Sequence, residues 1–482
     1  MVKIQVDNNN KVIMLNNKAL IAREGGITPT GTINITQNGI VDVTNYASAD
    51  VNVSGGSSFI GLAREVSANG VFQMPATNST FSLPSNATDV DSDAMRYAFY
   101  NCIGLTSANL SSLTTVSGES AMKYAFRGCT SLTSADLSNL TIVNGSSALS
   151  YAFNGCSSLT SLNLSSLITI SGSGALSYAF QMCTSLTSIN LLNLTTLSSK
   201  NAMNSTFNGC TSLTSVNLSS LTTVSGSSAM QSTFFNCTSL TNIDLSNLTT
   251  LSTDNAMQTT FHGCTSLTSA DLSNLTTING ISVMQSTFNG CTDLTNIDLS
   301  SLTTASGNKA MQTTFQGCTS LTSIDLSSLT TISGTNAMSS TFSGCSSLTS
   351  VLFTNLETIG TNSSSADYGQ FSQCFNNCTN LTSITFPKLE KIYCTGGTTT
   401  SYGTFASNTT IQKLYFPKLN TITYGSGAST SNQKACKNVF YGCSALTELH
   451  FSATNQAVIE ASAGYSTAWG RGAGNVTIYF DL

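Results

Sequence analysis

Residues 255–278, NAMQTTFHGCTSLTSADLSNLTTI, recur in close variants along most of the chain and decide its fold. The cysteine in the middle marks the period, because it stands at every 27th position from Cys102 to Cys345. The series then loosens and ends at three further positions, Cys378, Asn408 and Cys443. A fixed period of about 20–50 residues is typical of solenoids, so the sequence predicts a stack of about thirteen coils.

The second half of each unit has the spacing of a short strand followed by a turn. Leu267, Ala270 and Leu272 are apolar, whereas Ser269 and Asp271 between and beside them are polar. This alternation predicts a strand whose apolar residues point into the core. Its polar residues then face solvent. One coil cannot bury its apolar side alone, so stability must come from stacking.

The first half has a different spacing. Met257, Phe261 and Cys264 are separated by steps of four and three, which places them on one face of a helical turn. Asn255 stands where a helix N-cap belongs, and Gly263 suits the exit of a helix. We therefore expect each coil to contain a strand, a turn and one or two turns of helix.

This unit resembles the BspA-type leucine-rich repeat, in which an aromatic residue, a glycine and a cysteine precede a leucine-rich strand. The resemblance covers about residues 79–453. It is carried by Phe261, Gly263, Cys264, Leu267, Thr268 and Leu272 with their equivalents in the other coils. The family implies an α/β solenoid with a parallel β-sheet on its concave face. It includes adhesins, secreted surface proteins and domains of phage structural proteins, so the fold alone does not define the function.

The repeated cysteine allows two interpretations. Equivalent positions in neighbouring coils lie about 5 Å apart, so a ladder of disulfides or metal ions is conceivable. However, Asn408 replaces the cysteine in one coil, and neither a CxxC pair nor a histidine completes a zinc site. We therefore predict that Cys264 and its equivalents are small core residues beside Phe261, and we expect no metal and no cofactor. Cys374, Cys394 and Cys436 lie outside the regular series, and their redox state stays open.

The polar position of the strand forms a column along the predicted concave face. Four successive coils carry an acid there, at Asp244, Asp271, Asp298 and Asp325. Like charges on adjacent strands repel one another unless water, salt or a cation screens them. The row is a candidate site for a cation or for a polar ligand such as a glycan. The alternative is a solvated face that only keeps the solenoid soluble.

The last third of the chain departs from the repeat. Its coils are longer, and eight of the fourteen tyrosines lie in the final 115 residues. Long Tyr-, Gly- and Ser-rich loops on a rigid scaffold are typical of recognition surfaces, although a terminal cap would need bulky aromatics as well. The candidate binding residues here are Tyr393, Tyr402, Tyr415, Tyr424, His450 and Trp469.

Residues 1–55 do not follow the repeat. Residues 2–6 and 11–15 flank DNNN and predict a hairpin, and residues 32–36, 40–44 and 50–54 alternate like short strands. This piece resembles a β-rich motif of phage and prophage tail- or baseplate-associated proteins. The matching residues are Thr30, Gly31, Thr32, Ile35, Thr36, Asn38, Gly39, Asp42, Val43, Tyr46, Val51 and Val53. The resemblance implies attachment to other virion proteins through residues 1–55.

The predicted organisation has five parts. They are a β-rich attachment module (1–55), a linker with the N-terminal cap (56–90), the regular 27-residue repeats (91–360), irregular repeats with longer loops (361–453) and a C-terminal cap (454–482).

Composition limits the function. The net charge of −5 and the absence of a basic tract argue against a nucleic-acid partner. No stretch approaches the roughly 18 apolar residues of a membrane span, and the first residues lack the apolar segment of a secretory signal. Neither histidine, His262 or His450, lies in a known catalytic motif, so we expect no enzyme.

The leading hypothesis is therefore a non-enzymatic phage virion protein. Its solenoid would be a rigid spacer of about 60 Å that presents a surface to a host-cell glycan or protein. It would be made in the bacterial cytoplasm and built into the phage tail. The alternative is a BspA-like adhesin on the bacterial cell surface. A homo-oligomer is compatible with either.

Overall fold

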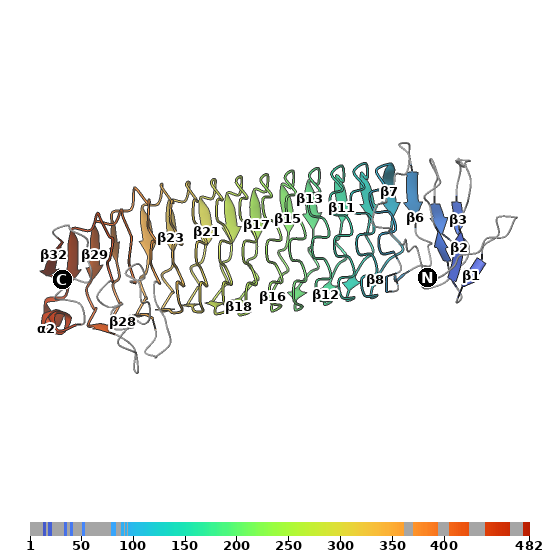
Figure 1. Cartoon of the computed structure of the whole chain (residues 1–482). Coiled ribbons are helices and arrows are strands. Elements are labelled where there is room, and N and C mark those ends of the chain that lie inside the picture. Colours follow the sequence, from blue (N-terminus) through green and yellow to red (C-terminus); the bar gives the residue numbers. More distant parts are fainter. Residues whose placement is uncertain are drawn as a thin grey trace. The chain divides into compact units, whose positions relative to one another are not determined.

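The structure is a computed structural model that describes residues 88–90, 92–93, 95–360, 370–393, 404–423, 439–462 and 476–482, together with the course of strands β1–β6. The chain divides into two compact units. Unit 1 comprises residues 1–221 and 229–240, and unit 2 comprises residues 222–228 and 241–482. Within each unit, coils of similar shape follow one another along a stack (Figure 1).

The N-terminal part of unit 1 is built of short strands. β1 (Ile13–Leu15) and β2 (Lys18–Ile21) are antiparallel, and β4 (Gly39–Val41) runs parallel to β2. β3 (Ile33–Ile35), β5 (Val51–Val53) and β6 (Ser79–Ser82) continue into the sheet of the coils. The predicted strand at residues 2–6 lies outside the described residues, so its predicted pairing with residues 11–15 is not tested; the described antiparallel pair joins β1 to β2.

Each regular coil contributes one strand to each of two parallel sheets, and in unit 1 these are five longer strands and four two-residue strands. The longer strands, which form what we call the strand face, are β7 (Leu105–Asn109), β9 (Ser134–Asp136), β11 (Ser161–Asn163), β13 (Ser188–Asn190) and β15 (Ser215–Asn217). The two-residue strands are β8 (Thr115–Val116), β10 (Ile142–Val143), β12 (Thr169–Ile170) and β14 (Thr196–Leu197). Residues that pair on neighbouring strands are 27 positions apart, as Ser188 and Ser215 are, so the period of the sequence sets the register of the sheet.

Unit 2 repeats the same plan. Its strand face contains β17 (Asn242–Asp244), β19 (Ser269–Asp271), β21 (Asn296–Asp298), β23 (Ser323–Asp325), β25 (Ser350–Leu352), β27 (Ser383–Thr385), β29 (Lys413–Phe416), β31 (Glu448–Phe451) and β32 (Thr477–Phe480). The second sheet contains β16 (Thr223–Val224), β18 (Thr250–Leu251), β20 (Thr277–Ile278), β22 (Thr304–Ala305), β24 (Thr331–Ile332), β26 (Thr358–Ile359), β28 (Lys391–Tyr393) and β30 (Thr421–Thr423).

The predicted solenoid with a parallel sheet is confirmed, and a strand of the strand face follows each of the thirteen predicted coil positions, as β19 follows Cys264. The predicted helical turns are wrong. Within the described part of the chain, only η1 (Ala453–Asn455) and α2 (Gln456–Glu460) are helical. Both lie after the last repeat.

The segment predicted as helix is a row of tight turns, which we call the turn wall. Asn255, Thr259 and Gly263 have left-handed backbones with φ of 58°, 53° and 72°. Between them, the amide of Thr260 donates to the carbonyl of Met257 three residues earlier, whereas the amide of Thr259 donates to Gln285 in the next coil. A left-handed residue at every fourth position interrupts the i to i−4 bonding of a helix. The repeated left-handed residue nevertheless places every fourth side chain on the same side of the segment. The spacing of the apolar residues therefore resembles that of a helix.

The core consists of identical side chains stacked from coil to coil. Phe261, Cys264, Leu267 and Leu272 are all completely buried, as predicted. The phenylalanines stack face to face, with 5.4 Å between the ring centroids of Phe261 and Phe288. Such contacts add about 0.5–1.5 kcal/mol per aromatic pair to the burial of the ring.

The cysteines of the described residues are buried and form no disulfide. The Sγ of Cys291 donates to the carbonyl of Phe261 in the preceding coil, at 3.1 Å. Asn408, which replaces the cysteine, donates through its Nδ2 to a different carbonyl of the preceding coil, that of Phe371, at 3.1 Å, and Thr410 donates to the carbonyl of Phe375 instead. The position therefore requires a small donor that satisfies a buried carbonyl. Cys374 is buried too, whereas Cys394 and Cys436 lie outside the described residues.

No helix in the described part of the chain has the length and apolar character needed to cross a membrane.

Candidate functional site

The strand face of unit 2 brings the predicted acids into register. Asp244 pairs with Asp271, and Asp271 pairs with Asp298, on the neighbouring strands β17, β19 and β21. Asp325 occupies the same position on β23. The first three are exposed and the fourth is partly exposed, because alternation along the strand turns Ile243, Ala270 and their equivalents inward.

These aspartates also shape the backbone. The Oδ1 of Asp271 accepts a hydrogen bond from the amide of Ser273 at 3.0 Å, and the Oδ1 of Asp298 accepts one from Ser300 at 2.9 Å. Asn217 in unit 1 accepts the same bond from Ser219 at 3.2 Å. The side-chain oxygen thus closes an Asx turn at the end of each strand. Asn and Asp both supply it, which explains why the two residues interchange in this column.

An open hollow of about 670 Å³ lies on the strand face over β17, β19, β21 and β23. It is lined mainly by polar residues of these strands: Asn242, Asp244, Ser269, Asp271, Thr295, Asn296, Asp298, Ser300, Ser323 and Asp325. All four candidate acids line this one hollow. Backbone hydrogen bonds of the sheet hold them, so the surface is preorganised.

The described residues provide no counter-charge for the acids of the hollow. Among the described residues, none of the four carboxylates forms an ion pair with a lysine, arginine or histidine. Nor do the described residues contain a group of three His, Cys, Asp or Glu side chains that could hold a metal ion. The hollow therefore offers negative charge and hydrogen-bond acceptors spread along a surface, without the ligand cage of a metal site.

A second polar cluster lies on the last strands of the same face. Tyr415 on β29, His450 on β31 and Tyr479 on β32 are in register. Their rings form a stack with 4.5 Å between the centroids of Tyr415 and His450 and 4.7 Å between those of His450 and Tyr479. His450 is buried in this sandwich.

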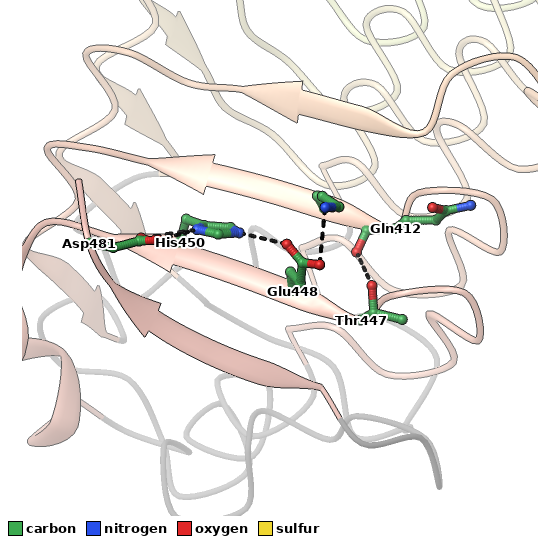
Figure 2. A network of polar contacts seen from close by, with 6 residues as sticks. Gln412, Thr447, Glu448, His450 and Asp481 are labelled. Atoms are coloured by element: carbon green, nitrogen blue, oxygen red, sulfur yellow. Dashed lines mark hydrogen bonds and ion pairs between the residues drawn. The ribbon is translucent and has the colours of Figure 1, made fainter.

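Both ring nitrogens of His450 face carboxylates (Figure 2). Nδ1 lies 3.0 Å from an oxygen of Asp481, and Nε2 lies 2.9 Å from an oxygen of Glu448. The other oxygen of Glu448 accepts from the Nζ of Lys413 at 3.0 Å. The hydrogen bond from His450, followed by that from Lys413, lowers the pKa of Glu448, and the hydrogen bond to Glu448 raises the pKa of Lys413. The cluster is thus a chain of polar contacts that connects β29, β31 and the residue after β32.

The remaining candidates are placed differently. Tyr393 lies on β28 in the second sheet, where it pairs with Thr423, so it does not share the strand face with Tyr415. Tyr402, Tyr424 and Trp469 lie outside the described residues. His262 lies on the turn wall and is half-buried, and burial lowers its pKa.

Sequence reasoning did not identify Lys413, Tyr479 and Asp481. The sequence does contain a pattern that points to the strand before Asp481 and to Tyr479 within it. Residues 477–480, TIYF, alternate like residues 448–451, ELHF, and that match aligns Tyr479 with His450.

The sequence profile of the BspA type leucine rich repeat region matches residues 92–227, 176–283, 258–366 and 371–467. The chain belongs to this family. A search of curated proteins finds no match. Among solved structures, the chain is similar to a leucine-rich repeat protein from Bacteroides ovatus, at 21% identity and a TM-score of 0.37 over 80% of this chain and 86% of that one.

Two further structures have a similar fold. A leucine rich cell surface protein from Faecalibacterium prausnitzii has 17% identity and a TM-score of 0.32, with 95% of this chain and 98% of that chain covered. The pneumococcal vaccine antigen PcpA has 13% identity and a TM-score of 0.34, with 100% and 99% covered.

Proposed function

We propose that this protein is a non-enzymatic adhesin that binds a glycan or protein on another cell through its strand face. The observation that carries the proposal is the hollow of about 670 Å³ lined by Asp244, Asp271, Asp298 and Asp325. Family membership supports the proposal, since BspA-type repeats occur in adhesins and secreted surface proteins.

The chemistry of the hollow favours a polar ligand. Carboxylates are strong acceptors for the hydroxyl groups of sugars and for the cationic side chains of proteins. The apolar side chains of the strands are turned into the core, so the hollow offers little apolar surface. Affinity would therefore come from several charge-assisted hydrogen bonds on a surface that does not reorganise.

A role in a phage particle stays a prediction. It rests on the motif in residues 30–53, whose side chains lie outside the described residues. The repeat supports the adhesin more directly, because the family profile covers most of residues 92–467. Virion partners, localisation in the phage tail and a homo-oligomer likewise stay predictions.

A glycan array and a cell-binding assay with the full chain test the adhesin. The informative variant replaces Asp244, Asp271, Asp298 and Asp325 with asparagine, which keeps the Asx turns and removes four charges. We expect it to bind its ligand about tenfold or more weakly, since each charge-assisted bond contributes about 1.5–3 kcal/mol. The control is Asp136→Asn, which changes the same column in unit 1, away from the hollow.

Unchanged binding by the fourfold variant would rule out the hollow. A further variant, Tyr415→Thr, tests whether the C-terminal stack is the binding surface. It installs the residue found at Thr385 in the preceding coil. If Tyr415→Thr abolishes binding and the fourfold variant does not, the binding surface is the Tyr415–His450–Tyr479 stack and the assignment to the hollow is wrong.

A further inference from the structure

A second unusual surface lies on the turn wall of unit 1. Tyr97, Tyr124, Tyr151 and Tyr178 are 27 residues apart and stack on one another, and we call them the tyrosine ladder. Their successive ring centroids are 4.8, 5.1 and 4.5 Å apart. All four are partly exposed. The ladder therefore presents ring edges and phenolic hydroxyls to solvent at every coil.

The backbone does not require tyrosine at this position. The residue is left-handed in each coil from Tyr97 to Gln373, with φ of 61° at Tyr124, 53° at Ser205 and 55° at Ser286. The amide of Tyr151 donates to the next coil at 2.9 Å, and the amides of Ser205 and Ser286 do the same at 2.8 and 2.9 Å. Serine or threonine thus fills the position in the following coils, from Ser205 to Ser340, with the same geometry. The fold therefore does not need tyrosine at this position in the four coils that carry it.

Basic side chains gather on the same surface. The guanidinium of Arg127 lies 5.7, 5.6 and 5.8 Å from the ring centroids of Tyr100, Tyr124 and Tyr151, and Lys123 lies 5.5 Å from that of Tyr124. Over the following 260 residues, up to Lys388, the sequence has only two basic residues, Lys200 and Lys309. Three of the five basic residues in the regular repeats (91–360) thus lie on or beside the ladder.

Two of these cations have no acidic partner among the described residues. Arg96 pairs with Asp93 at 3.2 Å, but neither Lys123 nor Arg127 forms an ion pair with any residue that the structure describes. The Nε of Arg127 donates to Asn154 at 3.2 Å, which orients the guanidinium across the rings. An oriented guanidinium without a carboxylate is suited to a carboxylate or sulfate from outside the molecule.

We propose that the tyrosine ladder with Lys123 and Arg127 binds a linear acidic polysaccharide that runs along the stack of coils. The cations would hold carboxylate or sulfate groups, and the row of phenolic hydroxyls would hydrogen-bond to the sugar hydroxyls. A single-stranded nucleic acid is also an extended polyanion, but its bases bind by stacking on aromatic faces. In the ladder, neighbouring rings cover those faces. This surface is separate from the hollow, so the inference does not depend on the proposed adhesin site.

The test is the affinity of the full chain for polygalacturonate, measured by calorimetry at low salt, with dextran and oligodeoxythymidine as comparison ligands. One variant, Lys123→Ser/Arg127→Asn, installs the residues found one coil later, at Ser150 and Asn154. A second variant, Tyr124→Ser/Tyr151→Ser, installs the residue at Ser205. Because each change copies a native coil, both variants should fold, which circular dichroism checks. The control, Lys309→Ser, removes an exposed charge in unit 2.

We expect the charge variant to lose about tenfold or more in polygalacturonate affinity, in line with two lost charge-assisted bonds. The tyrosine variant should lose affinity as well, and Lys309→Ser should not. Added salt should weaken binding, because exposed charges are screened. The proposal is overturned if the chain does not bind polygalacturonate, if it binds dextran equally well, or if it binds oligodeoxythymidine more tightly. Equal losses in the control and in the ladder variants would also overturn it.

Discussion

At the scale of single residues, the repeated cysteine is a structural group. Burial raises the pKa of Cys156, Cys210 and Cys318 to about 12, so their thiols are neutral at physiological pH. A neutral thiol is a poor nucleophile and a poor metal ligand. Its S–H group donates a hydrogen bond to a phenylalanine carbonyl of the preceding coil, as Cys291 does to Phe261.

This leads to a labelling prediction. In a Cys394→Ser/Cys436→Ser protein, the remaining cysteines should resist iodoacetamide at pH 8 in the native state and react fully in urea. Mass spectrometry of the alkylated protein measures the number of labelled thiols. Rapid labelling of any cysteine between Cys102 and Cys345 without denaturant would show that the core is open or that a thiolate is stabilised there.

The sequence predicted these residues well. The burial of Phe261 and Cys264 follows from apolar identity and from repetition, and neither requires knowledge of the backbone path. The role of Asn408 could not be derived in the same way. Its Nδ2 donates to Phe371 and its Oδ1 accepts from the amide of Phe375, both in the preceding coil, and only the stacked structure shows that these residues meet.

At the scale of elements, the His450 cluster attaches β32 to β31 and β29. Glu448 accepts from both His450 and Lys413, and its pKa is therefore lowered from the ordinary value of 4.5. A carboxylate whose pKa is lowered by folding stabilises the fold at pH values above its unfolded pKa. That contribution is lost as the pH falls through the folded value.

We therefore expect Glu448→Gln to weaken β32 in a pH-dependent manner. Hydrogen exchange of the amides of residues 477–480 should be faster in the variant than in the wild type at pH 6. The difference should disappear as the pH falls below 4.5 and through the lowered pKa of Glu448. Measuring both proteins at each pH removes the intrinsic pH dependence of exchange. A difference that is the same at every pH would assign the effect to packing and not to charge.

The elements also show where sequence patterns mislead. The step of four from Met257 to Phe261 is shared by a helix and by the turn wall, because left-handed residues repeat at every fourth position. Asn255 was interpreted as an N-cap, yet asparagine is also among the residues that best tolerate a left-handed backbone. Short segments of this kind cannot be assigned from spacing alone.

At the scale of the whole molecule, coils are interchangeable units. Each regular coil bonds mainly to its two neighbours with a constant offset of 27 residues, as the pairs Asp244–Asp271 and Asp271–Asp298 show. Stability in such a stack is approximately a sum over coils and their interfaces. Removing one whole coil should leave the remaining contacts intact.

We predict that deletion of residues 265–291, which joins Cys264 to Thr292, gives a folded and slightly less stable protein. The circular dichroism spectrum should keep its shape. The free energy of unfolding should depend less steeply on urea concentration, since unfolding exposes less surface. A 14-residue deletion, 265–278, is the matched control. It should unfold the protein around the junction because it places polar residues in core positions. Equal tolerance of both deletions would contradict the in-register stack.

The Asx turns of the strand face have a further consequence for the ageing of the protein. Spontaneous deamidation turns asparagine into aspartate, and it normally threatens a structure in which the amide is specifically bound. Here the turn at Asn217 uses only Oδ1, an atom that both residues possess. Asn163 and Asn109 form the same turn. Conversion to aspartate, as distinct from isoaspartate with its longer main chain, would add negative charge to the strand face and keep the turn, so that product would differ from the new molecule in electrostatics alone.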